Sequence, residues 1–313
     1  MSARTSARTS ARRAATAALA AVAITAVGIV PAASATTMTV TQQHQQGDSA
    51  RLAHQKWVAV HVLKGVFERG DTGVVDRFVR TGYIQHNPQV GDGAAALKAV
   101  GRSFHQQFPQ ATYSVKRVIA EGDLVLVHSN LVATPDTRGN AVVDIFRFQG
   151  GKIAEHWDVL EDVPATSVSG NDMFSTLSRP QTPIPGQRWL TERNKKLATD
   201  YYDRLLVHQD LSAIDTYVAP EYHQHNPGIA DGPEGARAGL ADLFQQSPQL
   251  RVEPKRIIAE GDLVAFHSHF IPSPGDPGLA IVDIFRIRDG KVVEHWDVIQ
   301  SVPTTSANDN TMF

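Results

Sequence analysis

Three polar residues interrupt apolar, strand-like stretches of this chain. Asp144 lies within VVDIFRF (142–148), and His156 and Asp158 lie within EHWDV (155–159). Side chains two residues apart on a strand point to the same face, so His156 and Asp158 share one. An unpaired polar group is costly to bury, and a carboxylate or imidazole held in an apolar pocket can transfer protons. The pattern therefore indicates either a general acid–base site or a structural His–Asp network.

The same polar residues return 139 positions later. If the strand faces converge, His128, Asp144, His156 and Asp158 line one cavity, with a QHNP loop at its mouth. Trp157 alternates to the opposite face, where an indole is more typical of a core than of a ligand platform. The supporting set predicted for the two pockets comprises His86, Asn87, His128, Asp144, Trp157, His225, Asn226, His267, Asp283 and Trp296, around His156, Asp158, His295 and Asp297.

Other common sites of chemistry are missing from the sequence. The chain has no cysteine, which removes disulfides, thiol nucleophiles and iron–sulfur clusters. Two His-x-His pairs, at 223–225 and 267–269, resemble metal-binding pairs, but the first copy has Ile84 and Asn130 at the matching positions. There is no HExxH, no Gly-x-Ser-x-Gly elbow and no phosphate-binding glycine loop. We therefore expect no metal site.

The internal repeat organises the whole chain. Residues 83–174 and 222–313 align without a gap, and about half of the aligned residues are identical. A period of 139 residues far exceeds the about 20–50 residues of solenoid units, so each copy is a whole domain. The predicted division is a signal peptide at 1–35, a flexible lead at 36–49, domains at 50–174 and 189–313, and a proline-rich linker at 175–188.

The first 35 residues have the composition of an export signal. Residues 1–13 are basic, residues 14–30 are apolar and uncharged, and Ala33-Ser34-Ala35 provides the small residues that signal peptidase needs. We expect cleavage after Ala35 and a secreted or otherwise extracytoplasmic protein, exported by the Sec or the twin-arginine route. The alternative is an uncleaved membrane anchor, for which this apolar run is at the short limit.

Each copy is expected to begin with helices and to end with strands. Helical spacing of apolar residues predicts a first helix through Val58, Val62 and Val66. This order predicts an α+β domain, in which about three helices pack on one face of a curved antiparallel sheet. The remaining elements predicted for the first copy are helices at 73–80 and 93–107, strands at 113–120, 124–132, 141–149 and 152–161, and hairpin turns at 122–123 and 150–151.

Composition and charge exclude several classes of partner. The chain is 42% hydrophobic and 20% charged, which is typical of globular proteins. Its net charge is −2, and the arginines of the first 35 residues leave the remainder more acidic, so it has no basic footprint for nucleic acid. No segment after residue 35 is long and apolar enough to cross a bilayer, so we expect no stable membrane contact after cleavage.

The repeated motifs resemble those of a known family. QHNP, AEGDLVxxHS and VDIFRxxxGKxxEHWDVxxxVP, present in both copies, are similar to motifs of SnoaL-like proteins, in particular the aldol-condensation-type bacterial group. That family has the nuclear transport factor 2-like fold. The resemblance spans about 50–174 and about 189–313, and it implies two tandem cone-shaped domains that bind a small molecule. Because domains of this fold often dimerise through their sheets, we also expect an internal pseudo-dimer.

The resemblance implies intramolecular aldol chemistry without a metal or a cofactor. In characterised SnoaL-like cyclases an aspartate near the end of the last strands acts as acid and base beside a histidine. By motif position these are Asp158 and His156, with Asp297 and His295 in the second copy. The carboxylate would remove a proton α to a carbonyl, and the histidine would protonate or orient the enolate oxygen. The alternatives are a noncatalytic small-molecule binding protein and a pseudo-dimer with polar but inert cores.

Overall fold

The computed structural model describes residues 40–181 and 188–313, with side chains from residue 47 onward. Residues 40–313 form one compact unit. The predicted signal peptide (1–35) and the start of the predicted flexible lead (36–49) lie outside the described residues. The rest of that lead is helical, because α1 (Val40–Leu63) begins within it. Within the described ranges, no helix is long and apolar enough to span a bilayer.

Repeat 1, which ends at residue 174, consists of helices followed by a five-stranded sheet. The first helix forms because Val58, Val62 and Val66 fall on one face, and all three are buried. Its end is a short π-helical segment, η1. The elements after α1 are η1 (Lys64–Glu68), α2 (Gly73–Phe78), β1 (Val79–Gln85), α3 (Gly93–Gln107), β2 (Thr112–Glu121), β3 (Leu124–Val132), β4 (Asn140–Gln149) and β5 (Lys152–Asp162).

The sheet of repeat 1 has the strand order β1-β5-β4-β3-β2. Strands β2 to β5 form the antiparallel run that the sequence predicts. The prediction of a purely antiparallel sheet is wrong for one strand, because β1 pairs in parallel with β5. This strand occupies residues that the sequence predicts to be the end of a helix and a loop. Its register shifts between Val79 and Ile84, so the strand lacks the regular alternation that a sequence pattern reveals.

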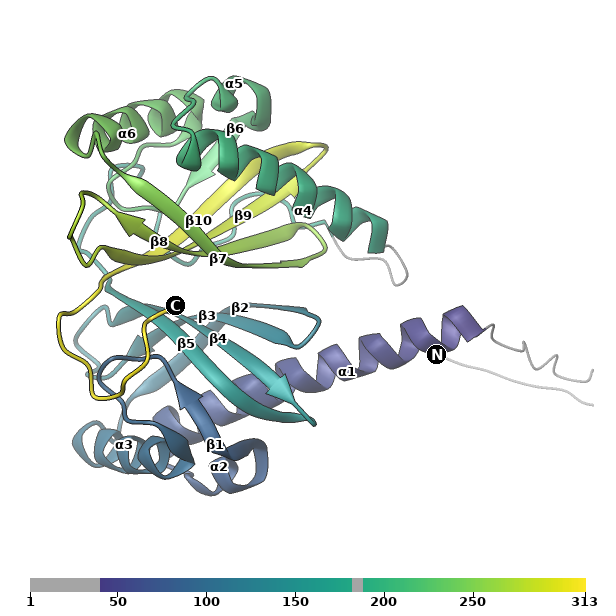
Figure 1. The fold of residues 1–313 in the computed structure, drawn as a ribbon, viewed down its shortest axis with the longest axis vertical. Helices are drawn as coiled ribbons and strands as arrows, with labels where there is room; N and C mark the ends of the chain where they lie inside the picture. The colour runs from purple at the N-terminus through teal and green to yellow at the C-terminus, as the bar shows by residue number, and fades with distance from the viewer. Residues whose placement is uncertain (1–39, 182–187) are drawn as a thin grey trace, which may run out of the picture. The chain divides into compact units, whose positions relative to one another are not determined.

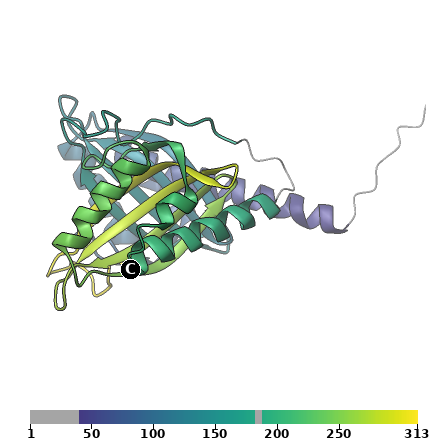
Figure 2. The same cartoon turned by 90° about the horizontal axis from the view of Figure 1, so that it is seen from above.

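Repeat 2, which begins at α4, has the same elements in the same order. Its sheet is arranged β6-β10-β9-β8-β7, and β6 again pairs in parallel with β10. In each repeat the helices cover one face of the sheet (Figure 1). Figure 2 shows the helices of repeat 2 lying across its strands. The elements are α4 (Arg188–Tyr202), η2 (Asp203–Val207), α5 (Ala213–Tyr217), β6 (Val218–Gln224), α6 (Gly232–Gln246), β7 (Arg251–Glu260), β8 (Leu263–Ile271), β9 (Leu279–Arg288) and β10 (Lys291–Ser301).

The two sheets pack against each other through the faces that the helices leave open (Figure 1). Their shared apolar cluster includes Trp157 of repeat 1 and Trp296 of repeat 2. The guanidinium carbon of Arg117 lies 3.8 Å from the ring centre of Trp296, and that of Arg256 lies 3.9 Å from the ring centre of Trp157. Reciprocal contacts of this kind are those of a two-fold dimer, so the repeats form an internal pseudo-dimer.

The segment between the repeats covers a charged cluster on repeat 2. The backbone N–H of Leu177 and the hydroxyl of Ser178 donate to the carboxylate of Glu294. Glu294 is also paired with Arg286, and their side chains are 0% and 5% exposed. The equivalent pair in repeat 1, Glu155 with Arg147, is 19% and 40% exposed. Sequence duplication has therefore placed one ion pair in two different environments.

This difference predicts unequal effects of two equivalent substitutions. Glu294→Ala leaves Nε2 of buried His225 and the linker donors without their acceptor, while Asp262 still pairs with Arg286, so we expect a loss of about 3 kcal/mol in the free energy of unfolding. Glu155→Ala breaks the partly hydrated pair with Arg147 and removes the acceptor of Nε2 of His86, and we expect a smaller loss, of about 1–2 kcal/mol. Urea denaturation of both variants measures the difference. Equal losses would show that the linker does not bury the Glu294 cluster in solution.

Candidate functional site

Two carboxylates and an imidazole of repeat 1 meet on the helix-covered face of the sheet. Strand pairing sets Asp144 on β4 directly opposite Asp158 on β5, and Phe146 opposite His156. Directly paired residues of antiparallel strands point to the same face, so the three polar side chains converge. All three are buried. The sequence prediction that Asp144, His156 and Asp158 share a face is therefore realised in the fold.

The protonation of His156 follows from a glutamine beside it. The backbone N–H of Asn87 donates to the side chain of Gln85 at 2.9 Å, which requires the receiving atom to be Oε1. The Nδ1 atom of His156 meets the same Oε1 at 2.9 Å and must therefore carry a proton. Its Nε2 lies 2.9 Å from Oδ1 of Asp144. Both ring nitrogens are thus held by the protein itself.

The environment of His156 favours its protonated form. Burial alone would lower the pKa of this imidazole, but the hydrogen bond to Asp144 and the charges of Asp158 and Asp144 raise it. The pKa of His295 in repeat 2 is raised for the same reasons, with Asp283 and Asp297 as its partners. Burying a carboxylate in an apolar interior is costly unless it is paired with an opposite charge, and an imidazolium between the two carboxylates provides that charge.

Among the described residues, one oxygen of the last aspartate in each cluster has no hydrogen-bond partner. Oδ2 of Asp158 accepts a hydrogen bond of 2.7 Å from Nδ2 of Asn87, and Oδ2 of Asp297 accepts one of 2.6 Å from Asn226. The Oδ1 atoms of both aspartates are buried and unpaired among the described residues. Burial raises the pKa of Asp158 to about 6, and it raises that of Asp297 as well. Such a carboxylate is suited to accept a proton near neutral pH.

Tyrosines from different elements hold the middle aspartate of the two repeats. In repeat 1 the hydroxyl of Tyr113, on β2, donates to Oδ2 of Asp144. In repeat 2 the hydroxyl of Tyr202, on α4, donates to Oδ2 of Asp283 at 2.9 Å. The position equivalent to Tyr113 is Val252, so the duplicated chain kept the hydroxyl while the residue that supplies it changed. The carboxylate, and not one particular strand, therefore requires this donor.

The cluster of repeat 2 lines a cavity of about 150 Å³. This volume is below the about 300–1,000 Å³ of pockets for drug-sized ligands, so it suits a small molecule. Asp283, His295 and Asp297 lie in its wall, which is otherwise largely apolar. The apolar and tyrosine residues of the wall are Tyr201, Leu205, Leu206, Tyr222, Ile229, Ala236, Leu240, Leu243, Phe270, Leu279, Ile281, Phe285 and Ile299.

The same three side chains have the donor set of a small metal site. In each repeat one ligand atom from the two aspartates and the histidine lies within 4.8 Å of the others. The nitrogens of His156 already bind Gln85 and Asp144, so a metal ion would have to break one of these hydrogen bonds to be coordinated. The arrangement fits proton transfer without such a rearrangement.

Some predicted pocket residues lie on the other face of the sheet. His128 is opposite Val143 and bonds Arg117, in the interface between the repeats, and His267 bonds Arg256 there. The expectation that His128 and His267 share the cavity therefore needs correction. Val127, one position earlier, is the residue opposite Asp144, and alternation turns its neighbour away.

The loop histidines and the tryptophans also face the interface. His86 stacks on Trp157 with ring centres 4.8 Å apart, and His225 stacks on Trp296 at 5.1 Å. The loop does bring Asn87 and Asn226 to the cluster, as predicted, through their bonds to Asp158 and Asp297. In each loop, the histidine thus contacts the interface between the repeats, and the asparagine that follows it contacts the cluster on the opposite face of the sheet.

Comparison with known proteins assigns both repeats. The model of the SnoaL-like domain matches residues 59–156 and again residues 198–295. This protein belongs to the SnoaL-like family. No curated protein matches the chain. Among similar solved structures, TsrD from Streptomyces laurentii is 25% identical over 35% of this chain and 89% of its own, with a TM-score of 0.31. A SnoaL-like polyketide cyclase from Agrobacterium tumefaciens is 19% identical over 34% and 91%, with a TM-score of 0.30.

Sequence reasoning missed the glutamines and tyrosines of the SnoaL-like clusters. Gln85 and Gln224 orient the histidines, and each donates through Nε2 to a tyrosine hydroxyl two residues earlier, Tyr83 or Tyr222. The repeated motif Tyr-x-Gln-His-Asn-Pro contained this signal, since both residues are identical in the two copies. The motif by itself does not predict the parallel strand β1, which positions the glutamine and the tyrosine.

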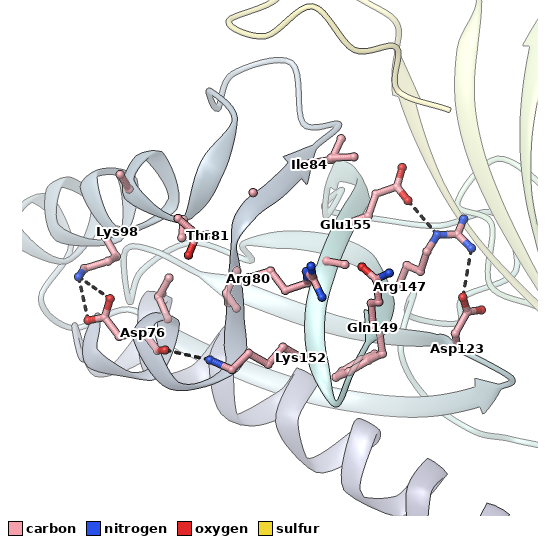
Figure 3. A pocket seen from close by; sticks show the side chains of 17 residues that line it. Asp76, Arg80, Thr81, Ile84, Lys98, Asp123, Arg147, Gln149, Lys152 and Glu155 are labelled. Atoms are coloured by element: carbon pink, nitrogen blue, oxygen red, sulfur yellow. Dashed lines mark hydrogen bonds and ion pairs between the residues drawn. The ribbon is translucent and has the colours of Figure 1, made fainter.

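A large charged groove of the first SnoaL-like repeat is separate from its cluster. It has a volume of about 850 Å³ and lies between the bulged part of β1 and the β4–β5 hairpin (Figure 3). Its walls carry the pairs Lys98 with Asp76 and Arg147 with Glu155, and none of the cluster residues lines it. The linker covers the equivalent charged cluster on repeat 2. The groove therefore marks a difference between the repeats and is not the site of the Asp–His–Asp cluster.

The raised pKa of Asp158 predicts a pH-dependent stability. The folded state holds this proton up to about pH 6, whereas an unfolded aspartate releases it near pH 3.9, so wild-type stability falls as the pH rises between these values. Asp158→Asn removes this loss. We expect the difference in unfolding free energy, variant minus wild type, to increase by about 2–3 kcal/mol as the pH rises from 4 to 7.

Urea denaturation at a series of pH values measures this change. Asp123→Asn, which alters a carboxylate whose side chain is 53% exposed, is the control for a general effect of removing a charge. A constant difference between Asp158→Asn and wild type across the pH range would show that Asp158 ionises normally.

Proposed function

We propose that this SnoaL-like protein catalyses acid–base chemistry on a small carbonyl compound without a cofactor, in the cavity of repeat 2. One observation carries the proposal: Oδ1 of Asp297, a residue that lines the cavity, is buried and has no hydrogen-bond partner in the part of the chain that the structure describes. Its other oxygen is held by Asn226, and its pKa is raised. A carboxylate held in this way is a general base with a fixed direction of attack.

The geometry changes the role first assigned to the histidine. His295 meets Gln224 at 2.8 Å and Asp283 at 3.1 Å, so neither ring nitrogen is free to reach an enolate oxygen. We assign that task to the hydroxyl of Tyr222, which lines the cavity and accepts a hydrogen bond from Nε2 of Gln224. Its own proton can therefore point to a ligand, and burial raises the pKa of Tyr222 well above its usual range, so the hydroxyl stays protonated.

The proposed step moves one proton and one electron pair. The proton on the carbon α to a carbonyl passes to Oδ1 of Asp297, and the electrons of the broken C–H bond form the enolate, whose oxygen accepts a hydrogen bond from Tyr222. The enolate carbon then attacks a second carbonyl, whose oxygen becomes an alkoxide and takes the proton from Asp297, which gives an aldol product; alternatively the enolate takes that proton back at another carbon, which gives an isomer. The imidazolium of His295 stabilises the ionised aspartate before the proton moves.

The proposal predicts hydrogen exchange in deuterated water. Protein beginning at residue 36 is incubated with a panel of small β-dicarbonyl compounds in D₂O, and exchange at the α-carbon is followed by NMR. We expect exchange above the buffer rate, reduced about 10²–10⁴-fold by Asp297→Asn, which keeps the size of the side chain but cannot act as a base. Asp158→Asn, the equivalent change in repeat 1, shows how much of the exchange takes place there.

Two outcomes would replace the proposal. Exchange that persists in the double variant Asp158→Asn/Asp297→Asn would remove the catalytic role of both aspartates. Saturable binding of a panel compound without any exchange would favour the noncatalytic binding protein, since the same cavity with one unpaired oxygen can hold a polar ligand.

We also propose that the protein is exported and cleaved after Ala35. The basic, apolar and small-residue segments of residues 1–35 support this proposal. Expression of the full-length gene in a bacterium with both export routes should give an extracytoplasmic protein, and amino-terminal sequencing should read Thr36-Thr37-Met38. Full-length protein retained in the membrane fraction would instead support an uncleaved anchor.

A further inference from the structure

Each repeat ends in a tail that lies against the other repeat. The tail after β5 contacts the loop that follows β6, where Val168 donates its backbone N–H to the carbonyl of Pro227. The tail after β10 contacts the loop that follows β1, where Ala307 donates in the same way to Pro88. These loops carry the asparagines that hold Asp297 and Asp158. Each tail therefore contacts the loop that supports the cluster of the other repeat.

One asparagine makes the central contact of the second tail. Nδ2 of Asn310 donates to the backbone carbonyl of Gln85 at 2.9 Å and to Oδ1 of Asp92 at 2.9 Å. The same Oδ1 accepts the backbone N–H of Gln85 at 2.8 Å. Asn310 and Asp92 thus hold both backbone polar groups of the glutamine that orients His156.

The first tail repeats this contact on the other repeat. Nδ2 of Asn171 donates to the backbone carbonyl of Gln224 at 3.0 Å and to Oδ1 of Asp231 at 2.8 Å. Asp231 in turn accepts the backbone N–H of Gln224 at 2.7 Å. Asn171 and Asn310 are 139 positions apart and occupy equivalent places in the two copies. The residues directly beside it differ between the two tails, whereas the asparagine is identical in both, as are the Met-Phe residues that follow.

We propose that Asn171 and Asn310 are positioning residues that act in trans. Asn171, in the tail of repeat 1, fixes the Asp–His–Asp cluster of repeat 2, and Asn310, in the tail of repeat 2, fixes that of repeat 1. Each tail asparagine holds the backbone of the glutamine, whose side chain holds the histidine. The next residue but one along the loop, Asn87 or Asn226, holds the aspartate. A single repeat therefore lacks one of the supports of its own site.

The inference rests on the acid–base role proposed for these clusters, but its test does not require turnover. The ring Nδ1 protons of His156 and His295 lie in buried hydrogen bonds to Gln85 and Gln224, so they exchange slowly with water. In full-length mature protein labelled with ¹⁵N-histidine, these protons give separate NMR signals. His156→Gln and His295→Gln variants assign them.

The expected result is a crossed pattern. Asn310→Ala should speed exchange of the His156 ring proton about five- to thirtyfold and leave His295 unchanged, because the support of one glutamine is lost. Asn171→Ala should speed exchange of the His295 proton by a smaller factor, because the hydroxyl of Ser169 still donates to the carbonyl of Gln224 at 3.0 Å, and should leave His156 unchanged. Thr305→Ala, an exposed residue of the same tail with no hydrogen bond among those described, should change neither.

Several results would overturn the assignment. Equal acceleration in both repeats would indicate a general loss of stability, and acceleration in the repeat that carries the substituted asparagine would place its effect in cis. No acceleration in either would show that the tails are dispensable. If instead the crossed pattern is found but no compound exchanges deuterium, the positioning role stands and only the proposed reaction fails.

Discussion

A carboxylate that is buried in an apolar cone must find hydrogen-bond donors inside the protein, and much of this structure follows from that constraint. Asp144 receives donors from Tyr113 and His156, and Asp158 receives one from Asn87. Each donor must itself be held in place. Gln85 holds His156, and Asn310 in the tail of the other repeat holds the backbone of Gln85. Among the described residues, one oxygen of Asp158 is left without a donor, and the equivalent oxygen of Asp297 is the one to which the proposed chemistry assigns the proton.

The fold was predictable where periodicity is strong and uncertain where pairing partners are distant. Strands β2 to β5 are rich in Val, Ile and Phe, and two-residue turns join β2 to β3 and β4 to β5, so both their existence and their order could be read from the sequence. Strand β1 pairs in parallel with β5 from far along the chain, and its shifted register leaves no local pattern. The choice between the two sheet faces failed at His128, because one residue of register decides whether a side chain meets the cavity or the interface.

The candidate site was predictable in its residue types but not in its supports. Asp158, His156 and Asp144 stood out because polar side chains interrupt apolar strands, which is costly unless they are paired. Tyr113 and Tyr202 carried no such signal, since a buried tyrosine on a strand or helix is ordinary. Only the structure shows that they reach the same atom from unrelated positions. The two copies thus keep a hydroxyl donor to this carboxylate, although the residue that supplies it differs.

The contacts of the two tails impose an order on the completion of the two clusters during synthesis. The loop of repeat 1 is contacted by Asn310, which is synthesised long after that loop. Repeat 1 can therefore form its helices and sheet early, but its cluster stays without one support until the second domain has folded beside it. Repeat 2 meets a tail that already exists when its own loop is made. In a growing chain the two clusters would thus complete their hydrogen bonds at different times.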